Sequence, residues 1–233
     1  MAVVAFDRSS LPDVSQLSVG ILGGTGDQGR GLAYRFARAG QRIRIGSRSA
    51  DRGKAAAQEL AGFPGVVEGT VSGGDNGYAA GADLVIIAVP WEGHGELVAG
   101  LASALAGKVV VDCVNPLGFD KQGPYPLKVS EGSAAEQAAA LLPESRVCAA
   151  FHHVSAALLA DPEVARIELD VLVLSEDRDA AAQVQALACR VPVMRGIYAG
   201  RLRNAGQVEA LTANLIAINK RYKAHAGIRI TDV

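Results

Sequence analysis

Short apolar runs alternate with amphipathic stretches of about ten residues between positions 18 and 150. The run at 83–89 contains four consecutive aliphatic residues, the pattern of a strand that helices cover on both faces of a sheet. In the first amphipathic stretch, Leu32 and Phe36 are four positions apart and should face the sheet together. The pattern therefore predicts strands and helices in regular succession.

This succession predicts an α/β fold with a doubly wound parallel sheet of the Rossmann type, because each helix must return the chain to the start of the next parallel strand. The predicted strands are 19–22, 41–45, 66–71, 83–89, 108–114 and 146–150. The predicted helices are one that ends at 39 and those at 51–60, 96–105 and 133–142.

The pattern changes after residue 150. Two strands, 171–174 and 191–198, and two helices, 180–189 and 208–222, predict a small α+β segment. We therefore expect three parts. They are an N-terminal tail (1–17), a dinucleotide-binding domain (18–150) and a small C-terminal α+β lobe (151–233).

Composition narrows the class of protein. The 233 residues are 49% hydrophobic and carry a formal net charge of −1, which gives nucleic acid or an anionic membrane no global attraction. Cys113, Cys148 and Cys189 have neither metal-ligand nor redox-pair spacing, which favours a reducing compartment, no disulfide framework and no metal site. The apolar start, 1–6, is too short for a signal peptide, and no apolar run reaches the ~20 residues of a membrane span. We expect a cytoplasmic protein whose ligands are small molecules.

A glycine-rich turn, Gly24-Thr25-Gly26-Asp27-Gln28-Gly29, follows the first strand and begins a helix. Gly24 permits a tight turn, Gly26 lets the backbone approach a pyrophosphate, and Gly29 lets helix and strand pack closely. The helix N-terminus would supply amide donors to the phosphates. This context predicts a dinucleotide site, although a glycine-rich turn can also form without a ligand.

The end of the second strand indicates which dinucleotide binds. NAD sites place an acidic residue there, ~20 residues after the turn, to bind the ribose hydroxyl. This chain has Ser47 and Arg48 instead, and Arg52 follows one helical turn later. A hydroxyl and two guanidinium groups would bind a 2′-phosphate that a carboxylate would repel. We therefore predict NADP(H), the alternative being that both arginines are solvated surface charges.

Further candidates follow later strands. Val89, Pro90 and Trp91 end the fourth strand at the edge where α/β sheets bind ligands, so the indole is predicted to line a nicotinamide pocket, or else to be a packing residue. Asn115 with Pro116 ends the fifth strand in the same way and could equally form an ordinary turn.

The order of several motifs resembles the NADPH-dependent reductases of coenzyme F-420 (F420), also called reduced-deazaflavin:NADP oxidoreductases. The similarity extends from about Val19 to Ile228. The motifs that carry it are Gly23-Gly24-Thr25-Gly26, Gly46-Ser47-Arg48, Val89-Pro90-Trp91-Glu92, Ser133-Ala134-Ala135-Glu136, His152 and Val208-Glu209-Ala210-Leu211-Thr212.

The resemblance implies a homodimer that transfers a hydride between NADP(H) and F420, with the deazaflavin between the first domain and the C-terminal lobe. Matching positions place Thr25, Ser47, Arg48 and Arg52 at the adenosine phosphate end of NADP. They place Trp91, Asn115, Leu117 and Ala156 near the nicotinamide. They place His152, Val154 and Thr212 at the deazaflavin, with His152 as a hydrogen-bond donor that positions the ring and Thr212 as a second contact. The alternatives are that His152 is a structural histidine and Thr212 an ordinary first-turn residue of its helix.

This sequence departs from the family at three positions near the deazaflavin: His153 replaces an expected Thr, Ser155 a Pro and Ala210 a Ser. A fourth departure, Arg52 for an expected Lys, keeps the positive charge. The C-terminal segment also carries Arg201, Arg203, Lys220, Arg221, Lys223 and Arg229, which would help to hold the acidic tail of F420. The alternative is that most of these residues individually belong to a solvated helix face.

Hydride transfer requires little of a protein beyond holding two flat rings in contact in a dry cleft, because the cofactors carry the chemistry. Two alternatives stay open. An imine or pyrroline-carboxylate type reductase would share the first domain but normally has a longer, all-helical second domain. A non-catalytic NADP-sensing protein would need no cleft lined by His152 and Thr212.

Overall fold

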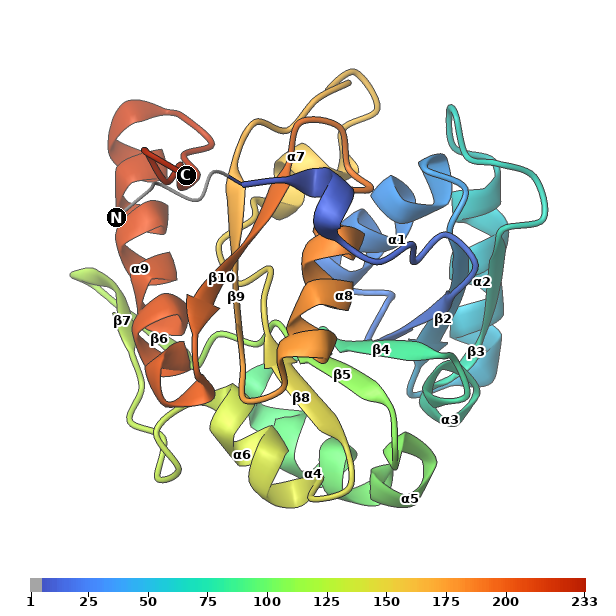
Figure 1. The fold of residues 1–233 in the computed structure, drawn as a ribbon, viewed down its shortest axis with the longest axis horizontal. Helices are drawn as coiled ribbons and strands as arrows, with labels where there is room; N and C mark the ends of the chain where they lie inside the picture. The colour runs from blue at the N-terminus through green and yellow to red at the C-terminus, as the bar shows by residue number, and fades with distance from the viewer. Residues whose placement is uncertain (1–5) are drawn as a thin grey trace.

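The computed structural model describes residues 6–233, so the part of the predicted tail at 1–5 lies outside the described residues. One eight-stranded sheet, in the order β10-β9-β8-β5-β4-β1-β2-β3, forms the centre of the molecule (Figure 1). Its strands are β1 (Ser18–Leu22), β2 (Arg42–Ser47), β3 (Val71–Asp75), β4 (Leu84–Ile87), β5 (Val109–Asp112), β8 (Arg146–Ala149), β9 (Asp170–Ser175) and β10 (Arg195–Gly200). The predicted doubly wound α/β fold is confirmed.

Nine α-helices and three 3-10 turns accompany the sheet within residues 6–233. The helices are α1 (Asp27–Arg38), α2 (Ala50–Ala61), α3 (Asn76–Ala80), α4 (His94–Gly100), α5 (Ala102–Leu105), α6 (Ala134–Leu141), α7 (Ala156–Ala160), α8 (Arg178–Ala188) and α9 (Ala205–Tyr222). The 3-10 turns are η1 (Arg8–Ser10), η2 (Trp91–Gly93) and η3 (Leu202–Asn204). None of these helices has the length and apolar character needed to cross a bilayer.

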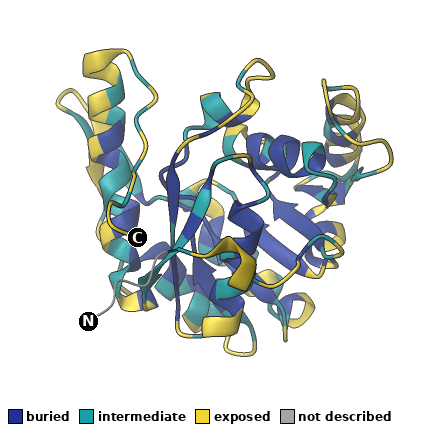
Figure 2. Cartoon of the chain, turned by 45° about the horizontal axis from the view of Figure 1, so that its top comes forward, coloured by how far each residue is buried: buried dark blue, intermediate teal, exposed yellow. Residues whose placement is uncertain are grey.

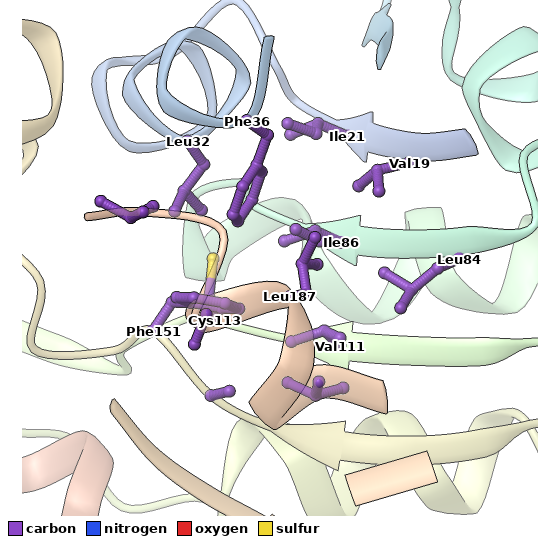
Figure 3. Close-up of a cluster of buried hydrophobic side chains, with 14 of the residues drawn as sticks. Val19, Ile21, Leu32, Phe36, Leu84, Ile86, Val111, Cys113, Phe151 and Leu187 are labelled. Atoms are coloured by element: carbon purple, nitrogen blue, oxygen red, sulfur yellow. The ribbon is translucent and has the colours of Figure 1, made fainter. Parts of the chain in front are cut away.

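Alternate residues of the strands supply two hydrophobic cores, one on each face of the sheet. Ile21 and Ile86 pack with Leu32 and Phe36 of α1 and with α8, as predicted for that face (Figure 3). Leu22 and Ile87 point to the other face, where α4, α6 and the start of α9 cover them. Both faces of the central strands are therefore buried (Figure 2), which explains their continuous apolar runs.

The third strand begins five residues later than predicted, because its sequence is not apolar. In β3, a Cβ on Gly73 would lie 2.1 Å from the carbonyl oxygen of Gly53, and one on Gly53 would lie 1.9 Å from that of Gly74. Helix α2 thus packs directly on the backbone of β3, a contact that side chains would prevent. The apolar residues before β3 form the turn that leads into it.

The two C-terminal strands extend the sheet of the first domain, an arrangement that the pattern did not predict. β9 runs antiparallel to β8 and pairs with it at two positions, Cys148–Ser175 and Ala149–Leu174. β10 runs parallel to β9 and starts at Arg195, four residues later than expected, after a turn in which Val193 has φ of 69°. Since Asp170 begins β9 four residues before Leu174, most of β9 projects past the carboxyl end of β8.

Two other elements, a hairpin and a short helix, were not predicted because their sequences lack apolar periodicity. A hairpin of β6 (Leu117–Asp120) and β7 (Gly123–Pro126) leaves the end of β5 and lies beside α9 (Figure 1). The short helix α7 packs on α1, where the buried guanidinium of Arg35 donates hydrogen bonds to the carbonyls of Leu158, Leu159, Asp161 and Val164. These hydrogen bonds fix the segment that follows β8.

Candidate active site

The glycine turn connects β1 to α1 at the carboxyl edge of the sheet. Gly24 donates its amide hydrogen to Gly46 (2.9 Å), and a Cβ on Gly29 would lie 2.8 Å from the Cα of Gly24. Because of these two glycines, the turn packs closely against the end of β2 and against α1. Gly26 is exposed and is the N-cap of α1 without a side-chain cap, so its open side lies before the first amides of the helix. Such a helix terminus favours an anion.

A pocket of about 820 Å³ opens in front of this turn. The turn, the end of β2 and the segment after β4 line it. Seven predicted cofactor residues are brought together there: Thr25, Gly26, Ser47, Arg48, Arg52, Val89 and Pro90. We call this cavity the first pocket.

Charge is unevenly distributed around the first pocket. Ser47 is buried, whereas Arg48 and Arg52 are exposed and form no ion pair with any described residue. The wall formed by η2 and α4 carries Glu92 and Glu96. A phosphate would therefore be held at the Ser47–Arg52 side, where the two guanidinium groups could donate to it.

Sequence reasoning missed Asn76, which also lines the first pocket. It is buried at the start of α3, and its side-chain oxygen accepts a hydrogen bond from the amide of Gly23 (3.2 Å). Asn76 thus ties the glycine turn to the end of β3. An available signal was Asp75-Asn76, a polar pair that follows the Gly73-Gly74 strand.

A second pocket of about 260 Å³ lies at the same edge of the sheet, beyond β5 and β8. Six predicted residues line it: Gln28, Asn115, His152, Val154, Ala156 and Thr212. The carbonyl of His152 accepts hydrogen bonds from Asn115 Nδ2 (2.8 Å) and Thr212 Oγ1 (3.1 Å). This carbonyl joins the loops after β5 and β8 to helix α9.

The imidazole of His152 is 3% exposed, and neither ring nitrogen has a hydrogen-bond partner among the described residues. Burial lowers the pKa of His152 to about 4, so the ring is neutral at pH 7 and has one N–H donor and one acceptor nitrogen. The side-chain oxygen of Asn115 is also buried without a partner. These groups fit a ligand ring that itself carries both donors and acceptors.

His153, the departure from the family pattern, lines the second pocket as well. Burial lowers the pKa of His153 to about 4, and its Nε2 accepts from the amide of Leu172 in β9 (3.4 Å). Among the residues that line this pocket there is no Asp, Glu, Lys or Arg. The cavity is therefore polar and uncharged, as suits a flat heterocycle.

The two pockets adjoin at the first turn of α1, where Gly26 lines the first and Gln28 lines the second. Gln28 donates a hydrogen bond to the carbonyl of Phe151 (3.1 Å), which precedes His152. Phe151 has φ of 66°, a left-handed conformation that costs energy in a non-glycine residue. Gln28 and the packing of Phe151 on Phe36 stabilise this bend.

Five other predicted residues line neither pocket. Gly24 and Gly29 are buried within the turn, and Asp27 is exposed at the start of α1. Leu117 begins the β6–β7 hairpin. Trp91 also lines neither pocket: its indole packs on the core and stacks on His94, with ring centroids 5.4 Å apart. Its contact with a nicotinamide stays a prediction.

Two of the six basic residues of the C-terminal segment form ion pairs, three lie at the end of α9, and Arg203 is exposed in η3. Arg201 pairs with Glu176 (3.2 Å) and Arg229 lies 3.5 Å from Asp170. Lys220, Arg221 and Lys223 are exposed at the end of α9, next to Asn219, which lines the second pocket. Within residues 6–233, no group of three His, Cys, Asp or Glu side chains could hold a metal ion.

Known proteins resemble this chain in sequence. The family model described as "NADP oxidoreductase coenzyme F420-dependent" matches residues 18–116. The F420-dependent NADP reductase of Methanothermobacter thermautotrophicus is 38% identical, over 94% of this chain and 97% of the relative. That of Methanocaldococcus jannaschii is 36% identical, over 93% of this chain and 99% of the relative.

Solved structures have the same architecture. A crystal structure from Arthrobacter sp. FB24, proposed to be an F420-dependent NADP reductase, has a TM-score of 0.77 and 28% identity, over 92% of this chain and 99% of that one. A pyrroline-5-carboxylate reductase from Coxiella burnetii is 15% identical, with a TM-score of 0.59, and shares the fold alone. The identity to the archaeal enzymes over nearly the whole length of each shows that this chain belongs to the family of F420-dependent NADP reductases.

Proposed function

We propose that this protein transfers a hydride between NADP(H), bound in the first pocket, and the deazaflavin of F420, bound in the second. One observation carries the assignment: a pocket with a serine and two unpaired arginines at its phosphate end adjoins a neutral, polar pocket at the first turn of α1. Two ligands placed in these pockets would approach each other beside Gln28.

The first pocket suits NADP(H) through residues of this chain. The Ser47 hydroxyl and the Arg48 and Arg52 guanidinium groups would bind the 2′-phosphate. Thr25, Gly26 and the α1 N-terminus would bind the pyrophosphate. Val89 and Pro90 form an apolar rim at the end of β4 that would exclude water.

The second pocket suits a deazaflavin through the unpartnered atoms described above. When bound, the nicotinamide and deazaflavin rings supply the hydride chemistry themselves. His152 would orient the deazaflavin with one N–H donor. Thr212 would offer an oxygen acceptor, since its one hydrogen goes to the His152 carbonyl, whereas Asn115 gives one of its two amide hydrogens to that carbonyl and would offer its side-chain oxygen and its second N–H. Because His152 is neutral, we assign it a positioning role and no obligatory proton transfer.

An absorbance assay tests the proposal. Protein, NADPH and oxidised F420 are mixed, and the visible absorbance of the deazaflavin is followed, with free flavins and an imine as alternative acceptors. Bleaching of F420 without comparable turnover of the others is the expected result. Binding of NADPH without turnover of any acceptor would instead support an NADP-sensing protein, and preferential turnover of the imine would support the other reductase class.

We also propose that the protein is a homodimer, as the family resemblance implies. Phe119 and Tyr125 of the hairpin and Ile218 and Tyr222 of α9 are exposed large hydrophobic residues on neighbouring elements. Such a surface is typical of an interface. Light scattering should give twice the 24.0 kDa of the chain, and a monomer at all concentrations would contradict the proposal. The cytoplasmic location and the absence of nucleic-acid partners stay predictions from the sequence.

A further inference from the structure

A buried charged pair lies behind the first pocket, and the proposed reaction does not use it. His94, the first residue of α4, and Asp112, the last of β5, are both 0% exposed. His94 Nε2 lies 2.6 Å from Asp112 Oδ2, and His94 Nδ1 lies 2.9 Å from Gln137 Oε1 of α6. The other Asp112 oxygen accepts from the amide of Val114 (2.9 Å).

The partners of His94 fix its protonation. The Gln137 amide nitrogen donates to the Glu131 carboxylate, so its oxygen must face His94. Both ring nitrogens therefore meet acceptors, which requires a proton on each. Burial opposes this charge, but the hydrogen bond and the charge of Asp112 outweigh burial and raise the pKa of His94 above its ordinary value. Glu209 of α9 is a further carboxyl group whose charge favours the imidazolium.

The imidazolium is stacked on Trp91, with centroids 5.4 Å apart and ring planes inclined by 29°. A cation against the face of an indole is attracted by the ring, more strongly where water is excluded. Trp91 belongs to η2, and both of its neighbours, Pro90 and Glu92, line the first pocket. The stack of Trp91 on His94 therefore holds the segment between β4 and α4 in place.

We propose that His94 is a positioning residue for NADPH: held as an imidazolium between Asp112 and Gln137, it fixes Trp91 and with it the η2–α4 wall of the first pocket. The inference rests on the proposed function in that the first pocket takes NADPH. His94 lines neither pocket, so it acts through Trp91 and the wall residues Glu92, Gly93 and Glu96.

The chain offers a direct readout, because Trp91 is its single tryptophan. A protonated imidazole in contact with an indole quenches its fluorescence, and a neutral imidazole does so far less. Asp112→Asn is the sharpest variant: it keeps the shape and an acceptor for Val114, but presents an amide N–H to His94 Nε2 and so leaves the ring neutral. Asp177→Asn is the matched control, since it breaks the Arg146–Asp177 ion pair (2.6 Å), which lines neither pocket.

We expect Asp112→Asn to increase Trp91 emission and to raise the Kd of NADPH by about three- to thirty-fold, the range that a cation–aromatic contact supplies, with the KM for F420 unchanged. Asp177→Asn should lower the melting temperature and leave emission and the Kd of NADPH as in the wild type. Emission that does not change in Asp112→Asn, or that increases without weaker NADPH binding, would overturn the proposal.

A measurement on the wild-type protein covers the case in which Asp112→Asn fails to fold. As pH rises, Trp91 emission should increase when His94 loses its proton, and the Kd of NADPH should rise with the same midpoint. Separate midpoints would overturn the inference. A protein that binds NADPH with this dependence but does not reduce F420 would contradict the proposed function alone, and one that binds no NADPH would overturn both.

Discussion

The hydroxyl of Thr212 has one hydrogen, and it is donated to the carbonyl of His152. Asn115 donates one of its two amide hydrogens to the same carbonyl, and burial keeps the His152 ring neutral. Individual atoms thus determine what the second pocket can recognise: oxygen acceptors from Thr212 and Asn115, one donor from His152 and the second amide hydrogen of Asn115. None of this follows from the local sequence, where a threonine in a helix and a histidine after a strand are ordinary. The family resemblance pointed to Thr212 and His152, whereas Asn115 was also a candidate from its place after the fifth strand.

Thr212→Val should raise the KM for F420 by about two- to ten-fold, the effect of losing one hydrogen bond at constant shape, and change the KM for NADPH less. Thr212→Ser keeps the hydroxyl and serves as the control, with kinetics close to the wild type. Steady-state kinetics with each substrate varied in turn make the comparison. A larger effect on NADPH than on F420 would count against Thr212 in the deazaflavin site.

Arg48→Ala should weaken NADPH binding by about 1–3 kcal/mol, the value of charge-assisted hydrogen bonds to a phosphate, and leave NADH binding nearly unchanged. The two dissociation constants can be measured by nucleotide fluorescence. Arg44→Ala is a suitable control, because this arginine lies on β2 over Tyr78 and lines neither pocket. Equal losses for NADPH and NADH would show that Arg48 does not read the 2′-phosphate.

At the scale of elements, the carboxylate of Glu209 joins α9 to α6. It accepts hydrogen bonds from Ala134 (2.9 Å) and Ala135 (3.2 Å), the first amides of α6, although it is 3% exposed. Burial raises the pKa of Glu209 from 4.5 to about 7, despite these two hydrogen bonds. The contact orders the start of α6 and holds α9 where Thr212 reaches the second pocket.

This shift predicts how stability varies with pH. Because the folded protein binds the Glu209 proton more tightly than the unfolded chain does, the free energy of unfolding should fall as pH rises from 4.5 to about 7. The loss is at most about 3 kcal/mol. The profile of Glu209→Gln, measured by urea denaturation, should lack this decline, whatever its absolute stability. Parallel profiles for the two proteins would show that Glu209 ionises normally.

Element positions could be predicted where apolar periodicity carried the information. The strands β1, β4 and β5 have this signal, and their predicted ranges overlap the observed ones. β3 does not, because Gly73 and Gly74 serve close backbone packing, and the β6–β7 hairpin is mostly solvent-facing. Apolar sequence patterns predict strands that are covered on both faces of the sheet, and they give no signal for strands that are not.

For the whole molecule, the α/β class and the strand-and-helix succession of the first domain could be predicted, but the continuous sheet could not. Whether β9 pairs with β8, and in which direction, depends on long-range packing that no local pattern encodes. The spacing of the cysteines predicted a reducing, cytoplasmic compartment. The structure shows that the three thiols are free and buried, which locates them in the fold and says nothing of the compartment.

Hydrogen exchange at one amide near the short pairing of β8 and β9 should show whether the second pocket is occupied. Only two paired positions connect these strands, and the amide of Leu172, just beyond them, is held by the side chain of His153. Its hydrogen should exchange with deuterium readily in the free protein and slowly when F420 fills the pocket, while the amide of Ile86, deep in β4, exchanges slowly in both states. The exchange rate of this single amide hydrogen would then show whether F420 is bound.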